Sequence, residues 1–147
     1  PLYMSPEAIQ SPLTVDGRSD LYGVGAVGYF LLTGKPVFDA QSVVELCQKH
    51  VDEMPIPPSE RSGNSASKEL EYAILCCLEK SRAKRPQTAR DLAQLLRKCP
   101  EAANWSLDEA DAWWSRHERG EADDDSTSEN ATAGQSGYDQ TLASNPE

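Results

Sequence analysis

Side chains with catalytic or metal-binding chemistry are sparse in this 147-residue sequence, and few of them are spaced to act together. The four cysteines form no C-x-x-C pair and fall on apolar helical positions. This favours buried reduced thiols over a disulfide or metal site and implies a reducing compartment. They are Cys47, Cys76, Cys77 and Cys99. Asp16 and Asp20 are close in sequence, but on their own they would make a weak metal site. His50, one of two histidines, ends a predicted helix and is expected to be structural, so we predict no metal site.

The acidic residues are concentrated towards one end of the chain. The formal net charge is −10, and residues 120–147 hold seven acids and no Lys or Arg, which leaves 1–119 with only about −3. A nucleic-acid-binding face would be basic, so this balance argues against a nucleic-acid partner. Residues 120–147 are also rich in polar and small side chains and nearly free of large apolar ones, so we expect a disordered acidic tail.

The element that must position the rest is a helix over residues 19–34. No charged side chain occurs from Leu21 to Thr33, Ser19 or Asp20 can cap the N-terminus, and Gly34 suits the left-handed residue that ends a helix. A helix that is apolar on every face must be buried on every face. At about 1.5 Å per residue this helix is too short to span a bilayer. Its three glycines each cost up to about 1 kcal/mol relative to Ala, which close packing by other backbone would explain. They are Gly23, Gly25 and Gly28.

Further helices are predicted on both sides of a proline-rich, extended stretch at 54–58. The capping box that begins at Ser42 starts a short helix, and the apolar spacing over 67–78 predicts another. Thr88 caps the next helix. All three tryptophans follow Pro100, two of them on a helix that begins after Ser106. We expect this helix to dock against the preceding ones; the alternative is an aromatic stripe that binds a partner.

Three short motifs, in this order and at suitable spacing, resemble protein kinases. Residues 1–7, P-L-Y-M-S-P-E, resemble the end of the activation segment, where the family has A-P-E and this chain has Ser5 in place of the Ala. Residues 16–25, D-G-R-S-D-L-Y-x-x-G, look like the start of the central helix of the large lobe in bacterial serine/threonine kinases, and 31–38, L-L-T-G-K-P-x-F, continue the match. Residues 85–89, R-P-Q-T-A, are similar to the late Arg-Pro element. The resemblance implies a mainly α fold, the C-terminal portion of the kinase large lobe.

The resemblance also implies roles for individual residues. Glu7 is expected to pair with Arg85, and the bidentate geometry of such a pair makes Arg irreplaceable by Lys. Asp20 would accept hydrogen bonds from the catalytic-loop backbone without doing chemistry itself. Pro1 and Met4 match the apolar wall that receives the substrate residue just after the phosphoacceptor, and ordinary loop packing is the alternative for both.

Two departures from the family bear on activity. Phe30 stands where many kinases carry a Glu that helps to bind substrates with upstream arginines, so that preference is in doubt. The chain has no Gly-rich loop, no phosphate-contacting Lys on a strand, no H-R-D-x-x-x-x-N and no D-F-G. Gly25, which ends the second motif, is expected to be structural, and no residue of this chain is expected to be catalytic.

The implied parent activity is phosphoryl transfer from ATP, with Mg²⁺, to Ser or Thr of protein substrates. We expect a kinase domain part at 1–99, an appended tryptophan-containing helix at 100–119 and the tail at 120–147, in a cytoplasmic protein with no membrane segment in this chain. By itself the chain is expected to be an inactive fragment whose central helix exposes an apolar patch. The alternative is a non-catalytic helical interaction module, either a truncated kinase relic or a pseudokinase. A third hypothesis is that the acidic tail acts as a nucleic-acid mimic.

Overall fold

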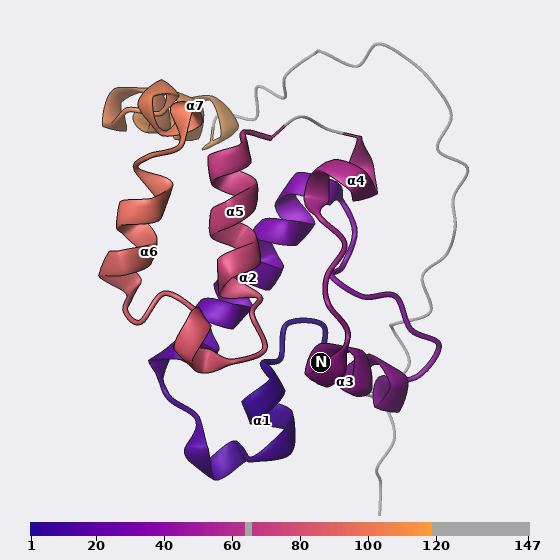
Figure 1. Ribbon diagram of the computed structural model, residues 1–147. Helices are drawn as coiled ribbons and strands as arrows, with labels where there is room; N and C mark the ends of the chain where they lie inside the picture. The colour runs from indigo at the N-terminus through magenta and orange to yellow at the C-terminus, as the bar shows by residue number, and fades with distance from the viewer. Residues whose placement is uncertain (64–65, 119–147) are drawn as a thin grey trace, which may run out of the picture. The chain divides into compact units, whose positions relative to one another are not determined.

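The computed structural model describes residues 1–63 and 66–118, and within these residues it contains helices and no strand (Figure 1). The predicted mainly α fold is therefore confirmed. The chain divides into two compact units, Pro1–Leu107 and a second that begins at Asp108, and each is described by itself. The α-helices are α1 (Pro6–Gln10), α2 (Gly17–Thr33), α3 (Val43–Asp52), α4 (Pro58–Ser62), α5 (Lys68–Cys77), α6 (Ala89–Leu96) and α7 (Leu107–Glu118), and the short 3₁₀ turns are η1 (Pro12–Thr14), η2 (Arg82–Lys84) and η3 (Pro100–Asn104).

The N-terminus of α2 differs from the prediction. Asp16 is the cap, because its carboxylate accepts a hydrogen bond from the Arg18 amide at 2.9 Å. The proposed caps, Ser19 and Asp20, instead lie in the first turn of the helix. The Ser19 hydroxyl donates to the carboxylate of Glu7, so it serves a tertiary contact and does not cap the helix.

The C-terminal end of α2 follows the prediction. Gly34 adopts a left-handed conformation with φ of 67°, and its amide donates to the Phe30 carbonyl at 2.7 Å. Glycine adopts this conformation at little cost, so it can stop the helix where the chain must turn towards α3.

Capping side chains also set the start of two other helices. α6 has a complete capping box, in which the Asp91 amide donates to Thr88 Oγ1 at 3.1 Å and the Thr88 amide donates to Asp91 Oδ2 at 3.0 Å. Ser42 caps α3 as predicted. The Glu45 carboxylate, however, accepts from the Gln41 amide, so the predicted box at Ser42 is only half formed.

The core forms where α2 crosses α5, which lie against each other in Figure 1. A Cβ added to Gly25 would lie 2.6 Å from Cβ of Cys77, and one added to Gly28 would lie 2.2 Å from Cδ1 of Ile74. Both glycines are therefore closely packed, but chiefly by side chains of α5 and not by the backbone that the prediction named. Gly23 differs, because its added Cβ would meet only the Tyr3 carbonyl oxygen at an ordinary 3.7 Å.

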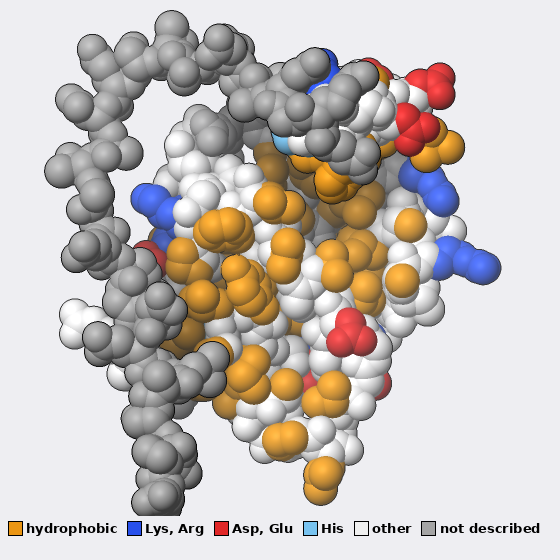
Figure 2. Space-filling view, turned by 180° about the vertical axis from the view of Figure 1, so that it is seen from behind, with side chains coloured by type: hydrophobic (Ala, Val, Ile, Leu, Met, Phe, Trp, Pro, Cys, Tyr) orange, Lys and Arg blue, Asp and Glu red, His pale blue; other side chains and the backbone are white. Residues whose placement is uncertain are grey.

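One face of α2 is open, which corrects the prediction of burial on every face and agrees with the patch expected for a fragment. Leu31 is 76% exposed and Val24 is 51% exposed, and Val27 and Phe30 are exposed as well. Figure 2, seen from behind, shows hydrophobic side chains spread over the side of the molecule where α2 runs behind α5. Within Pro1–Leu107, α5 therefore covers one side of α2 and leaves the other side apolar and exposed.

All four cysteines are free thiols, as predicted. Cys77 and Cys99 are buried, and Cys47 and Cys76 are half-buried. Burial raises the pKa of Cys77 to about 12, so this thiol stays protonated and packs as a small apolar side chain against Gly25.

The second unit contributes α7. Within this helix the rings of Trp113 and His117 stack with centroids 3.6 Å apart, and Trp113 meets Trp114 edge to face at 4.7 Å. The expected docking of this helix on the preceding ones stays a prediction.

The tail expected at 120–147 lies outside the described residues. Among the residues that the structure describes, no helix combines the length and the apolar character needed to cross a membrane.

Replacing Gly25 with Ala should destabilise the protein by about 1–3 kcal/mol, because the new methyl would clash with the rigid Cβ of Cys77. Gly23→Ala is the matched control in the same helix. It meets only an ordinary contact, and Ala favours the helix by up to about 1 kcal/mol, so it should be neutral or stabilising. Urea unfolding followed by circular dichroism measures both. Equal effects of the two substitutions would contradict the close crossing of α2 and α5.

Candidate functional site

The predicted contact between Glu7 and Arg85 is present and is the most buried ion pair among the described residues. Arg85 Nη1 lies 2.7 Å from Glu7 Oε1, and Nη2 lies 2.9 Å from Oε2, which is a bidentate arrangement. The Arg85 side chain is 0% exposed and that of Glu7 is 9% exposed. Lys could not reproduce these two parallel hydrogen bonds.

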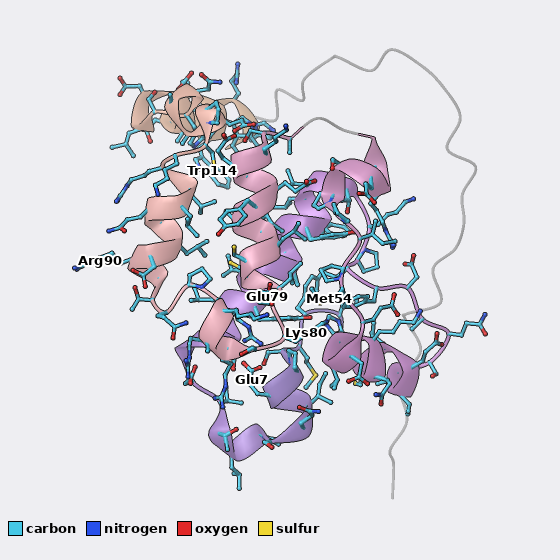
Figure 3. All side chains as sticks on the ribbon, in the orientation of Figure 1. Glu7, Met54, Glu79, Lys80, Arg90 and Trp114 are labelled. Atoms are coloured by element: carbon cyan, nitrogen blue, oxygen red, sulfur yellow. The ribbon has the colours of Figure 1, made fainter. Side chains whose placement is uncertain are left out.

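Every N–H of the Arg85 guanidinium has an acceptor. Nε donates to the Glu79 carbonyl at 2.7 Å, Nη1 also donates to the Arg18 carbonyl at 2.9 Å, and Nη2 also donates to the Lys80 carbonyl at 3.2 Å. A buried charge is costly unless it is paired and its remaining donors are satisfied, and here both conditions are met. The guanidinium therefore ties α1 to the start of α2 and to the turn that follows α5. Figure 3 shows Glu7, Glu79 and Lys80 gathered at the end of α5 that faces α1.

Glu7 is held in its ionised form. Burial alone would raise its pKa, but hydrogen bonds from Arg85 and Ser19 outweigh burial and lower the pKa to about 2. A carboxylate with so low a pKa, and with both oxygens already accepting hydrogen bonds, is a poor general base at neutral pH. The pair is therefore an anchor and not a catalytic dyad.

The anchor continues into an aromatic layer. The Arg85 guanidinium carbon lies 4.9 Å from the ring centroid of Tyr22, within cation–π range. The Tyr22 hydroxyl lies 2.8 Å from Nδ1 of His50, at the end of α3. His50 also meets the ring of Phe38 edge to face, with centroids 5.1 Å apart. Tyr22 and His50 are both fully buried. The Glu7–Arg85 pair, Tyr22, His50 and Phe38 therefore form one cluster that joins α3 to α1.

Lys80 holds the end of α3 from the other side. Its Nζ donates to the carbonyls of His50 at 2.8 Å and Lys49 at 3.3 Å, and it lies 4.6 Å above the ring of Phe38. A cation at a helix C-terminus satisfies carbonyls that have no partner within the helix. Burial lowers the pKa of Lys80 to about 8, against an opposing effect of Glu53, so the group remains mostly protonated at pH 7.

The remaining predicted site residues lie at different places. Pro1 and Met4 are exposed on one short segment, in which the Met4 amide donates to the Pro1 carbonyl at 3.2 Å. Asp20 is exposed on the first turn of α2, and Gly25 is buried against Cys77. The structure brings Glu7 and Arg85 together and leaves Asp20 apart from them.

Asp16 does not resemble a metal ligand. Hydrogen bonds from the side chain and amide of Arg18 hold its pKa well below the usual range. Its Oδ2 lies 2.7 Å from Arg18 Nη2 and 3.2 Å from Arg82 Nη1. Within the part of the chain that the structure describes, no group of three or more His, Cys, Asp or Glu side chains could hold a metal ion. The two hydrogen-bonded arginines leave Asp16 engaged in ion pairs.

The contacts of three residues around the ion pair, Tyr22, His50 and Lys80, could not be recognised from the sequence. Tyr22 belonged to a recognised motif, but nothing indicated that it lies beneath Arg85. His50 was expected to be structural, without an indication of its partner. Lys80 was not singled out, because its acceptors are backbone carbonyls, which every residue has.

No protein-family model matches the chain. Among curated proteins, the serine/threonine-protein kinase PknB of Mycolicibacterium smegmatis is 43% identical over 96 residues, which cover 65% of this chain and 15% of that protein. A probable serine/threonine-protein kinase of Corynebacterium efficiens is 37% identical over 94 residues, covering 62% of this chain and 14% of that protein. The kinase pkn3 of Myxococcus xanthus is 42% identical over 90 residues, covering 60% and 16%.

These matches confirm the resemblance to bacterial serine/threonine protein kinases that the short motifs indicated. The matched part spans only about 15% of the length of the curated relatives. The similarity therefore covers about 65% of this chain and leaves the family and the activity of a whole protein as proposals.

Truncating either partner of the ion pair should be strongly destabilising, because the other charge would remain buried without a partner. We expect Glu7→Ala and Arg85→Ala each to cost about 3–5 kcal/mol. The double variant should lose roughly 2–3 kcal/mol less than the sum of the two single variants. Urea unfolding of the four proteins at pH 7 measures this coupling energy, and additive losses would contradict the pairing.

The pair Glu45–Lys49, with a separation of 3.3 Å and side chains 44% and 28% exposed, is the control and should couple by no more than about 0.5 kcal/mol.

The coupling of Glu7 to Arg85 should also depend on pH. Because the pKa of Glu7 is depressed to about 2, its contribution is fully present above about pH 4.5 and is lost as the pH falls towards 2.

Proposed function

We propose that this chain forms the C-terminal part of the catalytic domain of a serine/threonine protein kinase, and that it supplies the end of the activation segment with the helices that support it. The observation that carries the proposal is the buried Glu7–Arg85 pair, which joins the two most distant motifs of the resemblance. The similarity to named kinases over 96 residues supports the same assignment. The parent reaction would be ATP-dependent phosphoryl transfer to Ser or Thr of a protein.

In this proposal the segment Pro1–Met4, which we call the docking segment, receives the substrate. Pro1 and Met4 are exposed and apolar, so a substrate side chain could pack on them without first displacing other parts of the described chain. Glu7 follows three residues after Met4 and is fixed by Arg85. The ion pair would therefore hold the docking segment at a constant distance from α2 and α5. Phe30, 41% exposed on α2, offers no carboxylate for an arginine-bearing substrate.

The open face of α2 fits the same proposal. Val24, Val27 and Leu31 expose an apolar strip that further large-lobe elements of a longer kinase would cover. The matched relatives are several times longer than this chain, so such elements are available in proteins of this kind. ATP and Mg²⁺, which the family implies, would be bound by those elements, because the motifs that hold them in kinases do not occur in this sequence.

The runner-up is a non-catalytic helical interaction module, either a truncated kinase relic or a pseudokinase. The exposed strip on α2 favours it, since that strip could equally bind a partner protein. An upstream coding sequence containing H-R-D and D-F-G would favour the kinase, whereas a start codon close to Pro1 would favour the relic. For the kinase we further propose a cytoplasmic catalytic domain, a kinase part at 1–99, an appended helix at 100–119 and a separate acidic tail.

A chimaera tests the proposed function. The matching 96 residues of the M. smegmatis PknB would be replaced by the matching residues of this chain, and phosphorylation of a generic protein substrate would be followed with radiolabelled ATP. We expect activity within about tenfold of the parent kinase. The same chimaera with Glu7→Ala should lose most of it, because its docking segment is no longer anchored. A folded but inactive chimaera would contradict the assignment.

The 147-residue chain alone should neither bind Mg-ATP nor transfer phosphate. Phosphoryl transfer requires two metal ions, a triphosphate and a hydroxyl held in line, and none of the motifs that hold them occurs in this sequence. Calorimetric titration with Mg-ATP and a radiolabelled transfer assay measure the two activities. Saturable nucleotide binding by a preparation free of other kinases would overturn this expectation.

A further inference from the structure

Positive charge is concentrated on the segment that leads into α6 and on α6 itself. Residues 80–98 hold seven Lys or Arg side chains and one acid, although the chain as a whole carries a formal net charge of −10. Three of the seven are engaged in the contacts described above. The other four are exposed, and among the described residues none of them forms an ion pair. They are Lys84, Arg90, Arg97 and Lys98.

The electrostatics of the helix explain only two of these four cations. Arg97 and Lys98 lie at the C-terminal end of α6, where the helix dipole favours positive charge. Arg90 lies in the first turn, where the dipole disfavours it, and Lys84 lies before the N-cap. Figure 3 shows Arg90 pointing away from the helices into solvent. The cations at this end of α6 therefore do not stabilise the helix that carries them.

Two of the four cations line a single groove. α6 lies beside α5 (Figure 1), and the groove between them has a volume of about 290 Å³ and is lined by both Lys84 and Lys98. The rest of its lining is largely apolar or already paired: Tyr72, Cys76, Arg85, Pro86, Asp91, Gln94 and Leu95. Asp91 accepts a hydrogen bond from the Thr88 amide in the capping box, so its carboxylate is partly engaged. The α5–α6 groove therefore combines apolar surface with two unpaired ammonium groups.

The positions of the two lysines set the length of a matching ligand. Lys84 precedes α6 and Lys98 follows it, and the eight residues of this helix extend about 12 Å. A ligand that meets both ammonium groups, without drawing the two side chains together over the apolar lining, must therefore be extended. An extended peptide advances about 3.3 Å per residue, so roughly four residues cover the length of the helix.

We propose that the α5–α6 groove binds an acidic segment of a partner protein in extended conformation. Two acidic positions about four residues apart pair with Lys84 and Lys98, and an apolar side chain between them packs on the lining. Tyr72, which is 61% exposed, offers the largest apolar surface for that side chain. The two exposed arginines of α6 add positive potential that steers an acidic segment towards the groove.

The lining favours a peptide over a nucleic acid. A nucleic acid needs a row of cations that follows its phosphates, whereas this groove places apolar side chains between its two lysines. The surface is also separate from the proposed substrate contact, because the described residues that line the groove do not include the docking segment. The proposal therefore goes beyond the proposed function and does not depend on kinase activity.

The test measures binding of a synthetic peptide to the 147-residue chain. The probe is fluorescein-labelled acetyl-G-E-E-S-L-S-E-E-G-amide, followed by fluorescence anisotropy at about 50 mM salt, where screening is weak. We expect saturable binding that the double substitution Lys84→Gln and Lys98→Gln weakens about fivefold, because two ion pairs are lost. Replacing the Leu of the peptide with Ser should also weaken binding about fivefold, because its burial on the groove lining is lost.

The matched control is the double substitution Lys35→Gln and Lys68→Gln. It removes the same charge from two exposed lysines outside the groove and should change the affinity by less than about 1.5-fold. Equal weakening by the two double substitutions would show attraction to net charge alone and would overturn the proposal. No saturable binding to the full chain would overturn it as well.

Other occupants of the groove are outcomes of the same experiment. Binding that appears only after removal of residues 120–147 would assign the groove to an acidic segment of this chain, and would overturn the assignment to a partner. A single-stranded oligonucleotide that binds more tightly than the peptide would do the same in favour of nucleic acid. The assay uses neither nucleotide triphosphate nor kinase substrate, so its failure is distinguishable from failure of the proposed kinase function.

Discussion

The structure of the first unit depends on the burial of one guanidinium. Arg85 can be buried only if its charge is paired and all its N–H groups find acceptors. Glu7 supplies the charge, and carbonyls of Arg18, Glu79 and Lys80 supply the rest. These acceptors belong to α1, to the first turn of α2 and to the turn after α5. The three segments must therefore meet at one point, which fixes where the segment Pro1–Met4 joins the helices.

The crossing of α2 and α5 determines what lies beneath that guanidinium. Gly25 lets Cys77 approach closely, and Tyr22, one turn earlier on the buried side of α2, then lies under Arg85. A bulkier residue at position 25 would push the helices apart and move the ring. The ion pair and the helix crossing are thus coupled, because the cation–π contact exists only when both are in place.

The sequence predicted the features that depend on local chemistry or on a recognised motif. The cap at Thr88 and the left-handed Gly34 follow from residue types at fixed positions, and the pairing of Glu7 with Arg85 follows from the resemblance to kinases. The predicted cap of α2 was wrong. The Ser19 hydroxyl donates to Glu7 instead, and only the tertiary structure reveals this contact. The contacts of His50 and Lys80 could not be predicted, because Tyr22 is 28 residues from His50 and the acceptors of Lys80 are carbonyls. The open face of α2 shows that an apolar pattern specifies what should be covered and not what covers it.

The site's chemistry is that of a rigid support. Glu7 is ionised with both oxygens occupied, Arg85 has no N–H left to offer, and the buried Tyr22 phenol keeps its proton. At neutral pH none of these three groups is available to exchange a proton or bind a ligand, so their role is to hold backbone in place. The backbone it holds leads on one side to Pro1 and Met4 and on the other to the end of α3. A substrate bound on the exposed segment would therefore rest on a surface whose position is set by residues it never touches.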